Sequence, residues 1–242
     1  MLNWLRALTN QSAVWPPIDA ELDDLTQAGL LKGMVLNAGS GWREVRHLVD
    51  GTVVNQDLHY PGDARTNLDI VSPLHRIPKP DGTFDGVLCI AVLEHVENPV
   101  DVVAELFRVT KPGGFLVCTV PFLQPEHKIP ADFQRYTRDG LEALLVKAGY
   151  EIEQTKALYT VWHTLHWIIY EWLHLRDTFL YRALRVLLLP PLVWLSRNSD
   201  VVSDKLATAF RVLARKPVGG APDDSRQDAA RPDRLGLRST VG

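Results

Sequence analysis

The stretch VLNAGSGW, from Val35 to Trp42, decides the fold class of this chain. An apolar run ends at Ala38, and Gly39 and Gly41 then form a tight Gly-Ser-Gly turn. Turns of this kind bring the backbone close to a nucleotide. Further along the chain, short β-rich runs alternate with helical patterns, the runs at 52–57, 85–90 and 114–120 and the helices at 42–49, 99–109 and 137–148. This alternation predicts an α/β fold with a parallel sheet covered on both faces.

The turn itself indicates which nucleotide it would meet. A dinucleotide fingerprint needs a third glycine at position 44, and this chain has Glu44 there. A carboxylate beside a helix start is a poor host for a diphosphate, so the turn favours a nucleoside without phosphates over NAD. Asp57 ends the second strand, 18 residues after Gly39, where a carboxylate can accept hydrogen bonds from both ribose hydroxyls. The alternative for Asp57 is a solvated residue at a strand end.

Four motifs, taken in order, resemble those of class I S-adenosylmethionine (SAM)-dependent methyltransferases of the type-11 group. They are VLNAGSGW, NQD, PDGTFDGVLCIAVLEHVENP and RVTKPGGFLVCTVPF, and the resemblance covers about residues 30–155. It implies a Rossmann-like, seven-stranded sheet whose last strand is antiparallel. Residues 206–215, which by pattern suit a strand or a helix, would supply that strand, and the helical segment 157–196 would be an insertion before it.

The resemblance also implies a SAM site. The backbone of Ala38, Gly39 and Gly41 would face the methionine part of SAM. Asp57 would hold the ribose, and Leu58 would lie against the adenine. Cys89, Ile90 and Ala91, at the end of the fourth strand, would line the pocket. The family often has an acid after the third strand, near the adenine. That position falls here at Ser72 or Pro73, and Asp69 comes too early.

Methyl transfer needs alignment of acceptor and methyl group, and needs a base only where the acceptor must lose a proton. Glu94 and His95, in the LEHV motif, are interpreted as anchors of the loop after the fourth strand, with catalysis as the alternative. Some related quinone O-methyltransferases bind a divalent metal with the help of an acid three residues before this glutamate. That position is Ala91 in this chain, so no metal is predicted.

The stretch PFLQPEHKIPADFQRYT, residues 121–137, follows the fifth strand on the ligand side of such a sheet. His127 is the candidate catalytic residue, because a histidine can take a proton from an acceptor hydroxyl near neutral pH. Its alternative is a surface or loop-holding histidine. Arg135 and Tyr136 are candidate substrate-binding residues, although Arg135 could instead pair with Asp132.

The segment 157–196 is predicted to form two helices, about 158–175 and 178–196. The pair Pro190-Pro191 is expected to interrupt the second of them. Its density of Leu and Trp leaves three alternatives: a cap over the active site, a dimer surface, or contact with a membrane interface. We expect the cap first and peripheral membrane contact second, either of which suits a lipid-linked acceptor. The histidines of the first helix form a stripe too long to converge on a metal.

Composition bounds the remaining alternatives. The chain has 242 residues, a formal net charge of −3 and two cysteines in apolar runs. No nucleic acid partner is expected from that charge, and the cysteines suit a reducing, cytoplasmic compartment, with membrane association left open. We find no secretory signal and no run of the roughly 20 apolar residues that a spanning helix needs. The expected domains are an N-terminal helical segment at 1–33, a methyltransferase domain at 34–216 and a disordered tail at 217–242.

The sequence thus predicts a SAM-dependent methyltransferase that acts on oxygen of a small-molecule, glycan or lipid-linked acceptor. One alternative is a non-catalytic module that keeps the fold for binding or membrane docking. An NAD-dependent oxidoreductase is the other, and Glu44 speaks against it. The acceptor and the oligomeric state do not follow from the sequence.

Overall fold

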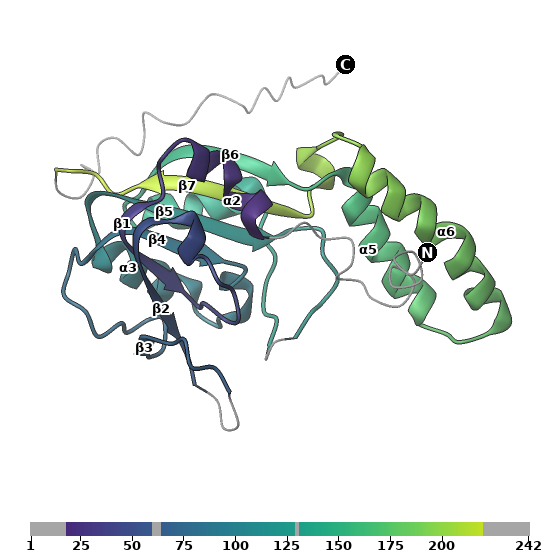
Figure 1. Ribbon diagram of the computed structural model, residues 1–242, viewed down its shortest axis with the longest axis horizontal. Coiled ribbons are helices and arrows are strands. Elements are labelled where there is room, and N and C mark those ends of the chain that lie inside the picture. The colour runs from purple at the N-terminus through teal and green to yellow at the C-terminus, as the bar shows by residue number, and fades with distance from the viewer. Residues whose placement is uncertain (1–17, 60–63, 129–130, 220–242) are drawn as a thin grey trace, which may run out of the picture.

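The computed structural model describes residues 18–59, 64–128 and 131–219. Seven strands form one sheet in the order β3-β2-β1-β4-β5-β7-β6 (Figure 1). The strands are β1 (Lys32–Ala38), β2 (Asp50–Asp57), β3 (Ile70–Val71), β4 (Phe84–Ile90), β5 (Thr110–Pro121), β6 (Glu151–Leu158) and β7 (Ala209–Arg215). The first five are parallel, and β7 runs antiparallel to both of its neighbours. The expected fold, with its antiparallel last strand, is confirmed.

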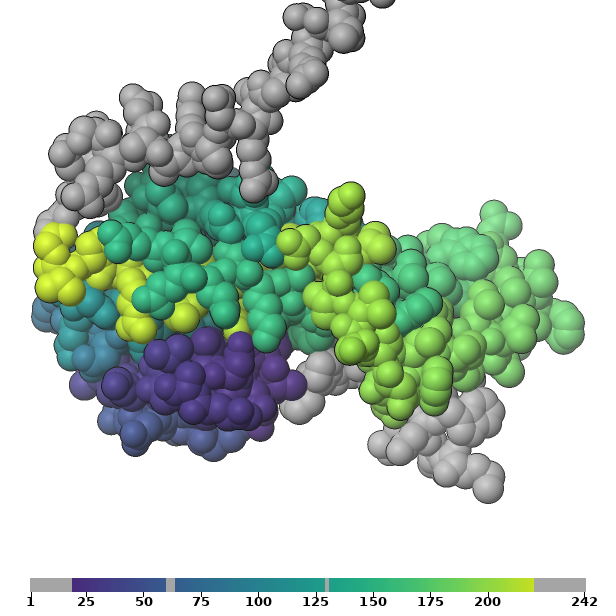
Figure 2. All heavy atoms as spheres, turned by 90° about the horizontal axis from the view of Figure 1, so that it is seen from above, coloured from purple at the N-terminus to yellow at the C-terminus, as the bar shows by residue number. Residues whose placement is uncertain are grey.

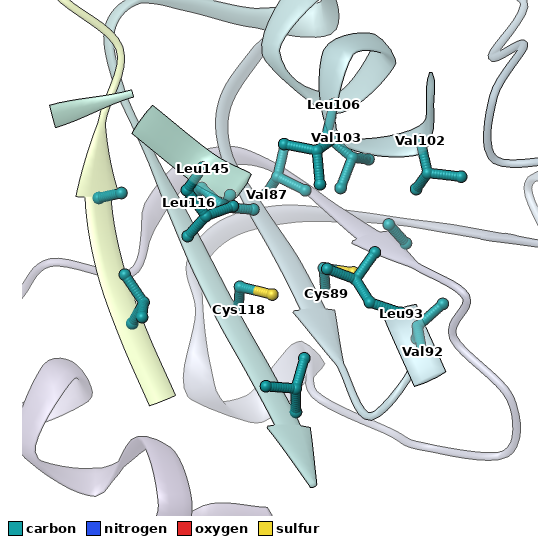
Figure 3. Close-up of a cluster of buried hydrophobic side chains, with 14 of the residues drawn as sticks. Val87, Cys89, Val92, Leu93, Val102, Val103, Leu106, Leu116, Cys118 and Leu145 are labelled. Atoms are coloured by element: carbon teal, nitrogen blue, oxygen red, sulfur yellow. The ribbon is translucent and has the colours of Figure 1, made fainter. Parts of the chain in front are cut away.

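Two separate hydrophobic layers cover the sheet. On one face, Leu22 and Leu25 of helix α2 (Ile18–Gln27) pack with inward residues of β1, β4 and β5. On the other face, helices α3 (Pro99–Val109) and α4 (Arg138–Lys147) bury their apolar sides. Cys89 and Cys118 face each other on β4 and β5 inside this second layer (Figure 3). Both are free thiols that act as small core residues.

The predicted N-terminal cap is present at helix α4 and absent at helix α3. Thr137 caps α4, since its side chain accepts a hydrogen bond from the backbone N–H of Gly140 at 3.1 Å. Asn98 precedes α3 but does not cap it, because its side-chain amide donates to Asp101 instead, at 2.6 Å. Pro99 occupies the start of α3, as expected.

The predicted helix at 42–49 is wrong. This segment contains only a short 3-10 turn, Arg46–Leu48. The carboxylate of Glu44 accepts the backbone N–H of Arg46 at 2.8 Å and so competes with helical hydrogen bonds. The same few residues must also return the chain to the start of β2 at Asp50, which leaves no length for a helix.

A helical hairpin stands between β6 and β7, made of α5 (Val161–His174) and α6 (Phe179–Asn198). The two helices are as predicted, but Pro190 and Pro191 lie inside α6 and do not interrupt it. The hairpin projects away from the sheet (Figures 1 and 2). It has a small core of its own around Leu173 and Leu189, so the tip of the hairpin does not share the core of the sheet.

The length of α6 also corrects the expectation about apolar runs. Because the proline pair does not end the helix, α6 has 20 residues with a mean hydropathy of 1.4 over its most apolar window. In the described part of the chain, α6 is the one helix that is long and apolar enough to cross a membrane, by length and composition alone. Residues before 18 and after 219 lie outside the described residues, and with them most of the predicted tail; the domain boundaries stay a prediction.

Candidate active site

Two glycines shape the turn after β1. Gly39 and Gly41 have φ of +62° and +55°, a conformation that disfavours residues with a side chain. A Cβ at Gly39 would lie 2.7 Å from a methyl carbon of Val92, whereas one at Gly41 would stand in open space. The N–H of Gly39 donates to Gln56 of β2 at 3.2 Å. The turn is therefore a fixed backbone cradle that is open on its Gly41 side.

Asp57 lies directly beside this cradle at the end of β2. Its carboxylate accepts the backbone N–H of Gly41 at 2.8 Å and that of Leu58 at 2.7 Å. It also pairs with Arg65 at 2.5 Å, and the Asp57 side chain is 20% exposed. Sequence reasoning placed Asp57 beside the turn and missed Arg65, which arrives from the loop after β2 and carries no motif of its own.

The cradle suits a nucleoside better than a dinucleotide. The side-chain hydroxyl of Ser40, at the centre of the turn, is fully buried and has no hydrogen-bond partner among the described residues. Such an orphaned group calls for a ligand or water. Residues 42–49 form no α-helix, so the helix N-terminus that holds a pyrophosphate in dinucleotide folds is missing from this described segment. Glu44 is exposed there and pairs with Arg46 at 3.0 Å.

A cavity of about 80 Å³ opens at the carboxyl ends of β4 and β5. Ile90 and Ala91, two of the residues predicted for the cofactor pocket, line this cavity. Three further lining residues were not predicted: Glu21 of α2, Arg43 and Tyr159. Their positions depend on how α2 and β6 pack onto the sheet, so no local sequence signal could have found them. The cavity is smaller than sites that enclose a whole ligand, so it can take only one end of a larger molecule.

Two buried polar atoms in this cavity lack hydrogen-bond partners in the described part of the chain. One carboxylate oxygen of Glu21 and the hydroxyl of Thr119 are buried without hydrogen bonds among the described residues. Burial raises the pKa of Glu21, against the opposing effect of the Tyr159 hydroxyl that donates to it. The cavity thus offers an acid, the guanidinium of Arg43 and a free hydroxyl, a set suited to a small zwitterionic group.

The other predicted cofactor residues differ in whether a ligand could reach them. Leu58 is 40% exposed beside Asp57 and remains available for contact. Cys89 does not line the cavity, because its side chain points into the core next to Cys118 (Figure 3). Asp69 accepts the backbone N–H of Asn55 at 2.8 Å and is therefore used in the sheet, which agrees with its early position. Ser72 is buried, and its backbone carbonyl accepts from Gln56.

The loop after β5 is held by its own ion pair. Arg135 binds the carboxylate of Asp132 with both terminal nitrogens, one of them at 2.6 Å, and donates to the carbonyl of Pro125 at 2.9 Å. Of the alternatives for Arg135, the structure shows the pairing. Tyr136 is buried in the core, and its hydroxyl lies 3.5 Å from the carbonyl of Leu93. Both residues therefore shape the loop rather than present a free side chain to a substrate.

His127 points toward the LEHV motif. Its Nε2 lies 3.7 Å from Oε1 of Glu94, and Nε2 of His95 lies 3.8 Å from the same oxygen. Glu94 is completely buried, and neither of its carboxylate oxygens has a hydrogen-bond partner in the described chain. The Glu94 carboxylate raises the pKa of His127, while burial of the ring opposes that rise. Sequence reasoning selected these residues separately and did not bring them together.

The histidines of α5 play separate parts, as their long stripe predicts. His163 closes the N-terminal capping box of α5 with Thr160, and His174 stacks on Tyr170 at the exposed end. His166 is buried, which lowers its pKa to about 4. The first half of α5 contacts the loop after β5, since the centroid of the Trp167 ring lies 5.7 Å from that of the His127 ring. The first half of α5 therefore lies beside the loop, while the rest of the hairpin projects away from the sheet (Figure 1).

Comparisons with known proteins agree with this geometry. A family model described as "Methyltransferase domain" matches residues 38–118, from the turn after β1 to β5. A probable S-adenosylmethionine-dependent methyltransferase of Mycolicibacterium smegmatis is 32% identical over 93 residues, which is 36% of each chain. The ubiquinone biosynthesis O-methyltransferase of Thiobacillus denitrificans is 32% identical over 105 residues, covering 38% of this chain and 45% of the relative. The matches thus span less than half the length of these relatives.

Solved structures show the same fold at low identity. The cyclase SpnF superposes with a TM-score of 0.53 at 17% identity, covering 90% of this chain and 95% of its own. A SAM-dependent methyltransferase from Archaeoglobus fulgidus has a TM-score of 0.50 at 13% identity, covering 82% of this chain and 93% of its own. The fold, the glycine turn with Asp57 and the matched domain agree: residues 38–118 match a methyltransferase domain, and the chain has the Rossmann-like fold of S-adenosylmethionine-dependent methyltransferases.

Proposed function

We propose that this protein is an enzyme that transfers a methyl group from SAM to an acceptor. The observation that carries the proposal is the cradle of Gly39 and Gly41 beside Asp57, at the strand ends where open α/β sheets bind ligands. Ribose hydroxyls would bind Asp57, and the methionine end would enter the cavity with Glu21 and Arg43. When bound, SAM supplies a methyl group on a positively charged sulfur.

Oxygen is the acceptor atom that the surroundings favour. A hydroxyl must lose a proton as it takes the methyl group, so the site needs a group that promotes this loss. His127 and the buried Glu94 lie after β5 and β4, the two strands whose ends line the cavity. This pairing supports O-methylation and gives His127 a direct role. The relative from Thiobacillus denitrificans is an O-methyltransferase, which supports oxygen as the acceptor atom.

The variant His127→Ala tests this role. We expect it to bind S-adenosylhomocysteine as the natural protein does, because His127 is not among the residues assigned to the cofactor. Turnover on a hydroxylated acceptor should fall roughly 100-fold, the lower end of the range for loss of proton-transfer assistance. The readout is release of S-adenosylhomocysteine in the presence of a panel of phenols and lipid-linked sugars. Unchanged turnover in the variant would remove His127 from the reaction.

The hairpin supports a lipid-linked acceptor and peripheral membrane contact on the cytoplasmic side. Leu180, Leu187 and Trp194 are each more than 60% exposed and lie at a spacing of seven residues, so they form one apolar stripe along α6. Ile168 and Trp172 of α5, with Leu175 directly after its end, form a second exposed stripe. Exposed apolar surface of this extent marks an interaction site, and tryptophan suits the membrane interface.

Flotation with phosphatidylglycerol-containing vesicles tests the membrane contact. The triple variant Leu180→Glu, Leu187→Glu and Trp194→Glu should no longer float with the vesicles, because each carboxylate would have to leave water. The matched control is Val100→Glu, an exposed valine on α3 of the main domain, which should float like the natural protein. Equal flotation of the triple variant, or none by the natural protein, would contradict membrane contact by this stripe.

A further inference from the structure

The cluster of Glu94, His95 and His127 carries chemistry beyond a simple acid–base pair. Glu94 and His95 belong to the 3-10 turn after β4, Leu93–His95, and His127 belongs to the loop after β5. One ligand atom from each of the three side chains lies within 4.8 Å of the other two. No other group of three potential ligand side chains in the described part of the chain converges in this way.

The carboxylate of Glu94 is the first argument for a cation. It is completely buried, and neither oxygen has a hydrogen-bond partner among the residues described. A buried carboxylate without partners is costly, unless it is protonated or a positive charge lies beside it. Both neighbouring imidazoles turn their Nε2 atoms toward it, at 3.7 and 3.8 Å, which is too long for a hydrogen bond.

The second argument is how the two imidazoles are held. Nδ1 of His95 lies 2.5 Å from the backbone carbonyl of Ala131, and Nδ1 of His127 lies 3.2 Å from that of Pro125. A carbonyl can only accept, so each Nδ1 carries the hydrogen and each Nε2 keeps a lone pair. Histidines that bind metals are fixed in this manner by a carbonyl on the other ring nitrogen.

Arg135 does not disturb this assignment. Its Nη2 lies 3.3 Å from Nδ1 of His127 and could donate to it. Its two hydrogens are directed, however, to Asp132 at 2.6 Å and to Pro125 at 2.9 Å. Arg135 and Asp132 therefore fix the loop that presents His127, and the Nε2 atom stays available.

We propose that Glu94, His95 and His127 bind a divalent transition metal of the zinc type, with open positions toward the acceptor. Two ligands at about 2.1 Å from such a metal and at a tetrahedral angle are about 3.4 Å apart. The two separations from Glu94, 3.7 and 3.8 Å, therefore need to close by only a few tenths of an ångström, and the two imidazoles lie within 4.8 Å of each other. Two imidazoles and one carboxylate suit zinc, iron or cobalt better than magnesium, which prefers oxygen ligands.

This ligand set differs from the one that the sequence argument dismissed. That argument expected an acid at position 91, where Ala91 offers none, and so predicted no metal. The third ligand comes instead from His127, 33 residues after Glu94. The site rests on the geometry alone; its use in catalysis rests on the proposed function, where a cation beside an acceptor hydroxyl would favour its ionised form. His95 and His127 are 17% and 23% exposed, so an acceptor can reach them.

The test is a metal titration of the full chain, made without a polyhistidine tag and treated with chelator. Zn²⁺ should bind with one-to-one stoichiometry, Mg²⁺ should bind at least tenfold more weakly, and Co²⁺ should produce visible absorption bands of a low-symmetry site. His127→Ala and Glu94→Gln should each weaken Zn²⁺ binding at least tenfold. The matched control is His47→Ala, an exposed histidine that pairs with Asp19, and it should bind Zn²⁺ as the natural protein does.

The outcomes are separable from those of the methyl-transfer test, because the titration uses neither SAM nor acceptor. Should Glu94→Gln not fold, as judged by circular dichroism, the partly exposed His127→Ala decides. A featureless Co²⁺ spectrum, or Zn²⁺ affinity that is the same in His127→Ala and in the natural protein, would overturn the metal site. That result would leave the cluster as an ion pair and would not affect the cofactor assignment.

Discussion

Replacing Asp57 with alanine is expected to weaken binding of S-adenosylhomocysteine by more than tenfold, or about 1.4 kcal/mol. The carboxylate would bind both ribose hydroxyls, and hydrogen bonds to a charged group contribute about 1.5–3 kcal/mol. The same carboxylate also holds the turn, since it accepts the N–H of Gly41 at 2.8 Å. Its loss therefore removes a ligand contact and loosens the cradle. Calorimetric titration of both proteins measures the difference.

The control for this variant is Glu44→Ala. Glu44 is an acid three residues after the turn, and its exposed side chain pairs with Arg46 at 3.0 Å. Its replacement should leave the affinity within twofold of the natural value. If Asp57→Ala binds as tightly as Glu44→Ala, the ribose contact lies elsewhere and Asp57 leaves the site.

The largest expected effect on stability comes from Asp24→Asn. Arg211 of β7 is 1% exposed, and its guanidinium bonds both oxygens of Asp24 on α2, at 2.6 Å each. Removal of one partner from a buried pair costs about 3–5 kcal/mol, and we expect about 2–3 kcal/mol here because the Asp24 side chain is 40% exposed. Thermal denaturation should show a melting temperature lower by roughly 5–10 °C.

The hydrogen bonds from Arg211 hold the pKa of Asp24 well below its usual range. The stabilisation is therefore present above the pKa of the unfolded chain, about 3.9, and is lost as the pH falls below it. Asp177→Asn is the control, because that aspartate pairs with Arg182 on the surface and both are more than 60% exposed. Its melting temperature should not change. Equal melting of the two variants would show that the buried pair contributes nothing specific.

The Asp24–Arg211 pair also matters for the cavity. Arg211 donates to the backbone carbonyl of Glu21 as well, and Glu21 lines the cavity from the same helix. We therefore expect Asp24→Asn to weaken cofactor binding as well as lower stability. This link between α2 and β7 crosses most of the chain and has no signature in the sequence.

Local patterns predicted the parts of the site that lie close together along the chain. Gly39, Gly41 and Asp57 occupy two adjacent strand ends, so the parallel sheet brings them together once the strands are recognised. The antiparallel seventh strand followed from the family resemblance and not from its own pattern, which suited a helix equally well. The core positions of Cys89 and Cys118 could likewise be inferred from the apolar runs around them.

The errors arose where side chains or tertiary packing override a local pattern. In 42–49, the Glu44 carboxylate accepts the backbone N–H of Arg46 and so competes with helical hydrogen bonds. Helix α6 continues through Pro190 and Pro191 without a break. Glu21, Arg43 and Arg65 join the site from a preceding helix or from loops, so only the folded arrangement identifies them. The convergence of His127 on Glu94 is of the same kind, because it depends on the ends of β4 and β5 being neighbours.

The central claim is that the cradle binds SAM and not a dinucleotide. Calorimetric titration of the purified, folded protein with S-adenosylhomocysteine and, separately, with NAD tests it most directly. Our account predicts a micromolar dissociation constant for S-adenosylhomocysteine and no heat of binding for NAD. Binding of NAD, or no binding of S-adenosylhomocysteine by protein that melts cooperatively, would contradict it.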